Sequence, residues 1–150
     1  MKNDKFLMAG IIGTLSTLMA EIVTQICKIL GFAEYSDYEL SSLFVTANKP
    51  SWLMGLVVQG MVGSVVSILL YYLLKRVGHE HILIKSTVSG IVAWLGFEII
   101  FGVLIKDNTF SIRPMSGYYS HLIGAIIFGL TVGILQKRYL FAERVMEQHS

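Results

Sequence analysis

Residues 52–74 read WLMGLVVQGMVGSVVSILLYYLL, twenty-three consecutive residues without a charged side chain. A helix rises about 1.5 Å per residue, so roughly 20 residues cross the hydrocarbon core of a bilayer, which is about 30 Å thick. Three more stretches are of this kind, and we expect four spans, at residues 6–30, 52–74, 86–105 and 116–135. Each span is predicted to be a helix, because backbone groups in lipid must pair within their own segment.

The composition agrees with a membrane environment. Of the 150 residues, 54% are hydrophobic and 15% are charged, whereas a soluble domain carries about 25% charged residues. A net charge of +2 is too small for a nucleic-acid-binding surface. The single cysteine, Cys27, excludes an internal disulfide and a multi-cysteine metal site. The predicted class is an all-α, polytopic membrane four-helix bundle that forms one domain over residues 1–150.

The orientation follows from the basic residues. Eight of the twelve lie near the two termini and in the turn between the second and third spans; the other four are Lys28, Lys49, Lys106 and Arg113. Since Lys and Arg accumulate on the cytoplasmic side, both termini are predicted to be cytoplasmic. The connection at residues 31–51 then lies outside.

This outer connection contains a helix-start signal. Ser36 and Glu39 have the spacing of a capping box, which predicts a short amphipathic helix at the outer membrane interface. Tyr35 and Tyr38 suit that depth. An irregular solvated loop is the alternative.

The chain also contains a candidate internal repeat. Spans one and three align without a gap, and spans two and four align through their cytoplasmic ends. A duplication would give two hairpins of the same orientation, related by an axis along the membrane normal. Chance similarity between apolar helices is the alternative. The aligned pairs include Gly13 and Gly90, Glu21 and Glu98, Gln59 and His121, Gly63 and Ala125, and Ser67 and Gly129.

The most polar residues of the four spans lie at one depth, about 4–7 Å from the span midpoints toward the outer side. They are Glu21, Gln59, Glu98 and His121, with Gln25 one turn further out on the Glu21 face. An ionisable group at this depth costs roughly 2.5 kcal/mol or more unless it is neutralised, paired or hydrated. We therefore predict a binding site for a proton, a metal ion or a small cation. Glu21, Glu98 and His121 are the predicted metal ligands. The alternative is a structural cluster in which protonated glutamates and glutamines cross-link the bundle.

No catalytic motif is present, neither a Gly-x-Ser-x-Gly elbow nor a His-Glu-x-x-His helix, a phosphate loop or a dinucleotide fingerprint. We expect no enzymatic activity, and the sequence identifies no cofactor. The leading hypothesis is a transporter or channel module. The alternative is a non-catalytic assembly or accessory subunit of the membrane. A homodimer and a complex with another membrane protein are both open.

Several features resemble a family of uncharacterised small four-span bacterial integral membrane proteins. The resemblance covers most of the chain and implies a setting in the bacterial cytoplasmic membrane, without implying an activity. The matching features are a Gly-rich first span, an outer loop ending in Lys49-Pro50, Gln59 and Gly63 in the second span, and Gly124 and Gly129 in the last.

The first span is also similar to the first helix of small multidrug-resistance transporters, in which a membrane glutamate couples a proton to a cationic substrate. The similarity rests on residues 20–23, AEIV, followed by Lys28 and Gly31-Phe32. It implies a coupling role for Glu21 alone. This chain departs from that family in its greater length, its large outer loop and the additional Glu98.

Overall fold

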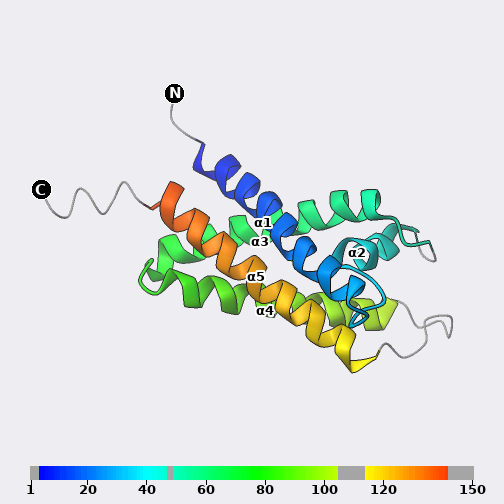
Figure 1. The fold of residues 1–150 in the computed structure, drawn as a ribbon. Helices are drawn as coiled ribbons and strands as arrows, with labels where there is room; N and C mark the ends of the chain where they lie inside the picture. Colours follow the sequence, from blue (N-terminus) through cyan, green and yellow to red (C-terminus); the bar gives the residue numbers. More distant parts are fainter. Residues whose placement is uncertain (1–3, 47–48, 105–113, 142–150) are drawn as a thin grey trace, which may run out of the picture.

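The computed structural model describes residues 4–46, 49–104 and 114–141 (Figure 1). Within these ranges every regular element is a helix, and all but the short α2 are long and apolar enough to cross a membrane. The predicted class, an all-α membrane four-helix bundle, is confirmed. The helices are α1 (Lys5–Ile29), α2 (Asp37–Thr46), α3 (Trp52–Val77), α4 (Ile82–Leu104) and α5 (Met115–Tyr139).

The four spans lie close to where the apolar stretches placed them. The largest differences are at the basic end, where α3 and α5 continue past the predicted limits and α4 begins four residues early. A helix can continue beyond the hydrocarbon core of the bilayer, because polar residues such as Lys75 also form helix readily. Gly78, at φ +94°, ends α3 in a conformation that favours glycine. Lys2, Lys106, Arg113 and Arg144, used above for orientation, lie outside the described residues.

The helices are not packed evenly around an axis. α1 lies between α3 and α5, and α4 packs mainly against α5, whereas α3 and α4 touch very little. The start of α1, the end of α5 and the turn between α3 and α4 lie at one end of the bundle, and α2 lies toward the other (Figure 1). Large apolar side chains are exposed on all four long helices, among them Leu15, Val65, Val92 and Ile134. These surfaces suit contact with a lipid bilayer.

Small residues bring the long helices together. A Cβ atom added to Gly13 would overlap the carbonyl oxygen of Gly63, so α1 and α3 meet backbone to backbone. A Cβ added to Gly90 would lie 2.7 Å from the carbonyl oxygen of Ala125, which places α4 equally close to α5. Helices in lipid associate through such close van der Waals contact.

The short helix predicted after Ser36 is present as α2, and its capping box is formed. The Ser36 backbone N–H donates to Glu39 Oε2 at 3.1 Å, and the Glu39 N–H donates to Ser36 Oγ at 3.4 Å. We expected this helix to lie on the outer surface. It is instead inserted between the long helices, where Tyr38 is only 1% exposed. A Cβ on Gly55 would overlap the Tyr38 carbonyl, so the missing side chain makes room for α2 against α3.

Candidate functional site

Glu21 is a structural anchor at the end of the bundle that holds α2. Its side chain on α1 is buried, and Oε1 accepts hydrogen bonds from Gln25 Nε2 at 2.8 Å and Trp52 Nε1 at 2.9 Å. Oε2 accepts from the backbone N–H of Tyr38 at 2.9 Å. Gln25 therefore joins Glu21, as their spacing of four residues predicts. One carboxylate fastens the first turns of α2 and α3 to α1.

Further polar contacts hold α2 to α1. The Tyr38 hydroxyl lies 3.0 Å from Thr17 Oγ1. Burial raises the pKa of Tyr38 above its usual value, and the hydrogen bond with Thr17 opposes only part of this rise. The phenol therefore stays protonated at neutral pH. Lys28 Nζ lies 2.6 Å from Glu39 Oε1, an ion pair that is partly open to solvent.

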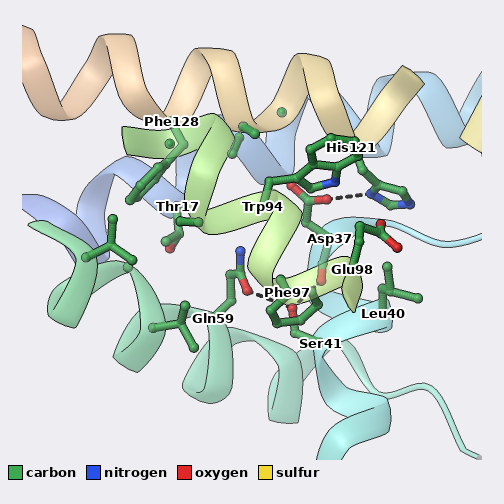
Figure 2. Close-up of a pocket in the computed structure, with 18 residues that line it drawn as sticks. Thr17, Asp37, Leu40, Ser41, Gln59, Trp94, Phe97, Glu98, His121 and Phe128 are labelled. Carbon is green, nitrogen blue, oxygen red and sulfur yellow. Dashed lines mark hydrogen bonds and ion pairs between the residues drawn. The ribbon is translucent and has the colours of Figure 1, made fainter. Parts of the chain in front are cut away.

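A cavity of about 60 Å³ lies beneath α2, between the four long helices (Figure 2). A cavity of this volume holds about four water-sized groups. Polar and aromatic side chains share its wall, and they come from every helix. The polar ones are Thr17, Asp37, Ser41, Gln59, Glu98 and His121, and the aromatic ones are Trp94, Phe97 and Phe128.

An acid–histidine pair forms one side of this cavity. His121 Nδ1, on α5, lies 2.6 Å from Asp37 Oδ1, on the first residue of α2 (Figure 2). The two side chains are 3% and 13% exposed. A buried imidazole next to a carboxylate forms an ion pair when it carries a second proton and a neutral-ion hydrogen bond when it does not. This pair also ties α2 to α5.

Gln59 and Ser41 form the opposite side. Ser41 Oγ lies 2.8 Å from Gln59 Oε1 and 2.5 Å from the carbonyl oxygen of Asp37. A hydroxyl has one hydrogen, so Ser41 donates to one of these acceptors at a time. The structure places Gln59 Oε1 at the Ser41 hydroxyl and Nε2 on the side away from Ser41 (Figure 2).

Trp94 and Glu98 line the cavity from α4. Glu98 is half-buried. The Trp94 indole nitrogen is buried, and among the described residues it finds no hydrogen-bond acceptor. Figure 2 draws this nitrogen on the side of the ring toward the Asp37–His121 pair. A buried N–H without an acceptor is rare in proteins, which makes Trp94 a notable part of the wall.

The structure does not assemble the predicted metal ligands. In the part of the chain that it describes, no three His, Cys, Asp or Glu side chains are arranged to hold a metal ion. The carboxylate oxygens of Glu21 accept hydrogen bonds from residues at the starts of α2 and α3. Glu21 is not among the residues that line the cavity. His121 and Glu98 do line the cavity, together with Gln59. The five predicted site residues thus divide into an anchor, Glu21 with Gln25, and a cavity wall.

Asp37, Ser41 and Trp94 were missed as site residues. Asp37 and Ser41 lie four residues apart on one face of α2, but that face was expected to look toward water at the membrane surface. A usable signal was present in Trp94, since a tryptophan near the middle of a span does not fit the interfacial positions that this residue prefers.

The wall combines groups that attract a cation with a pair that can take up and release a proton. Its small volume restricts the ligand to a few atoms. No protein-family model, curated protein or solved structure matches the chain.

Proposed function

We propose that this chain is a small transporter or channel module that binds a proton or a small cation in the cavity beneath α2. The observation that carries this proposal is the 2.6 Å pair of Asp37 and His121 in a wall that also contains Glu98. Ionisable residues within a membrane bundle are rare because they are energetically unfavourable there, and they commonly mark ion or proton paths. Histidine is a common proton carrier in proteins.

The place of the cavity favours access from the side. α3 and α4 touch little, and Val62, which faces this seam from α3, is 37% exposed. A ligand reaches the Asp37–His121 pair along this seam without displacing the tightly packed α1.

We also propose that both termini are cytoplasmic, in a bacterial inner membrane. In support of this, six of the eight basic residues that the structure describes, all except Lys28 and Lys49, gather at the end of the bundle away from α2 (Figure 1). These residues are Lys5, Lys75, Arg76, Lys85, Lys137 and Arg138. Basic residues of this kind set orientation during insertion.

The test is ion flux in proteoliposomes with an entrapped pH dye. Asp37→Asn is expected to lower the proton or cation-driven flux about tenfold or more, which corresponds to 1.4 kcal/mol. Glu98→Gln, a second change in the wall, is expected to lower it as well. Glu80→Gln is the matched control, since Glu80 is exposed in the turn far from the cavity.

Circular dichroism of each variant separates lost function from lost fold. If folded Asp37→Asn conducts as fast as the parent, or if the parent is no faster than protein-free liposomes, the proposal fails.

One observation favours the second candidate, an accessory subunit held by a structural hydrogen-bond cluster. The Glu21 carboxylate is occupied by three donors that join α1, α2 and α3. A protein of this kind gives no flux in isolation, and it is recovered from mild detergent with a stoichiometric membrane partner or as a homodimer.

A further inference from the structure

The cavity lies beside the interface of α3 and α4, two helices that touch little. The aligned repeat places the α1–α5 interface on the α4–α3 interface. Where α1 meets α5, a Cβ on Gly124 would lie 2.9 Å from Thr24 Cγ2, so these helices are in direct contact. The aligned residues in the other interface are Val62 and Phe101. These two side chains are larger than those of Gly124 and Thr24, and α3 and α4 touch little.

α2 packs beside this interface. Phe44 of α2 packs edge-on against Phe97 and Phe101 of α4, with ring centroids 4.6 and 5.5 Å apart. Of these rings, Phe97 also lines the cavity. Its wall has two kinds of surface, the aromatic faces of α4 and α5 and polar groups from all five helices.

We infer that the cavity takes a small protonated amino alcohol, the class that has a primary ammonium and a hydroxyl on a two-carbon chain. This inference rests on the proposed cation binding at the same site and adds the chemical class of the ligand. A two-carbon amino alcohol is of the size that about four water-sized groups would fill.

The ammonium group matches the acceptors. Asp37 Oδ1 is taken by His121, and Oδ2 has no hydrogen bond from any described residue although it borders the cavity. Glu98, on α4, is a second acidic residue that lines the cavity. A primary ammonium has three N–H donors, whereas a dehydrated metal ion needs a shell of six or more oxygens in most hard-cation sites. Apolar and aromatic side chains supply contact for the two carbons.

The hydroxyl matches Trp94. The indole N–H needs an acceptor, and an alkylammonium ion has none to offer. A hydroxyl oxygen accepts from Trp94 Nε1 and donates its own hydrogen to a carboxylate. The orphan donor thus selects an amino alcohol over a simple amine of the same shape.

The test is calorimetric titration of the purified full-length chain in sodium-free detergent buffer with ethanolammonium and with propylammonium, which replaces the hydroxyl by a methyl group. Ethanolammonium is expected to bind about tenfold more tightly, the effect of one satisfied hydrogen bond. In Trp94→Phe this ratio is expected to fall to about one. Tyr72→Phe, a matched change at an exposed aromatic outside the cavity, is expected to keep the ratio. The trimethylated amino alcohol is expected not to bind, since it is too large and has lost its N–H donors.

Equal affinity of the parent for the two ammonium ions overturns the inference, whether or not Trp94→Phe folds. Flux that depends on Asp37, without binding of either ammonium ion, overturns the inference and leaves the proposed function standing. Absence of both binding and flux rejects the two together.

Discussion

Alanine in place of Gly55 is expected to displace α2 and to lower the free energy of unfolding by about 3 kcal/mol. The added Cβ would overlap the carbonyl group of Tyr38, which is backbone and has no rotamer to change. α2 has little freedom to move aside, because Glu21 holds the Tyr38 N–H and His121 holds Asp37. The measurement is chemical unfolding in detergent, followed by circular dichroism.

The same variant is expected to lose binding in the cavity, since Asp37 and Ser41 move with α2. Gly96→Ala is the matched control. A Cβ on Gly96 of α4 meets nothing within 4 Å, so stability should change by no more than about 0.5 kcal/mol. Equal stability of the two variants would show that α2 does not lie against α3 as described.

Removing the Glu21 side chain is expected to lower the free energy of unfolding by about as much as Gly55→Ala does. Glu21→Ala leaves the buried backbone N–H of Tyr38 without its acceptor and also removes the acceptor of the partly exposed Trp52 indole N–H, at a combined cost of about 3 kcal/mol. Glu21→Gln keeps one acceptor oxygen but replaces the other with a donor that faces an N–H group. We expect an intermediate loss for glutamine, about 1–2 kcal/mol.

The fluorescence emission of Trp52 reports the loss of its hydrogen bond to Glu21. It is measured in a Trp94→Phe background, where Trp52 is the only tryptophan. Both Glu21 variants are expected to shift the emission to the red as Trp52 loosens, alanine more than glutamine. Glu80→Gln serves again as the control. If Glu21→Gln is as stable as the parent, with unchanged emission, then Glu21 does not anchor α2 through two accepting oxygens.

These expectations change what a loss of flux in a Glu21 variant means. The resemblance of the first span to small multidrug-resistance transporters implies that Glu21 carries the coupled proton. In this structure Glu21 accepts hydrogen bonds that position α2, and α2 in turn positions Asp37. A flux defect accompanied by lower stability therefore points to the anchor, and we propose the Asp37–His121 pair for the proton role.

Much of the fold was predictable because lipid imposes simple rules. An apolar run long enough to span the bilayer must be a helix, and glycine on one face allows a close neighbour, as at Gly13 and Gly63. The capping box at Ser36 and the i, i+4 bond from Gln25 to Glu21 are local, so the sequence specifies them. The repeat stays a prediction, and the matched contacts of Gly13 with Gly63 and of Gly90 with Ala125 support it.

The position of α2 was not predictable in this way. Its polar face can contact water, or it can face a bundle interior that offers hydrogen-bond partners. The partner of Asp37, His121, lies 84 residues later in the chain. Hydrophobic periodicity describes which face of a helix is apolar, but it does not state which helix lies opposite. The described part of the chain keeps Glu21 apart from His121 for the same reason, since α2 supplies a hydrogen-bond partner to each of them.

The contacts of α2 also have an order in biosynthesis. Chains are made from the N-terminus, and early segments fold while later ones are still being added. Glu21, Thr17, Gly55 and Gln59 all precede α4, so the first three helices contain most of what holds α2 in place. The hydrogen bond between Asp37 and His121 can form only after α5 has been translated and inserted. The cavity beneath α2 is thus complete only when α5 is in place, and a chain released before α5 would leave Asp37 without its histidine partner.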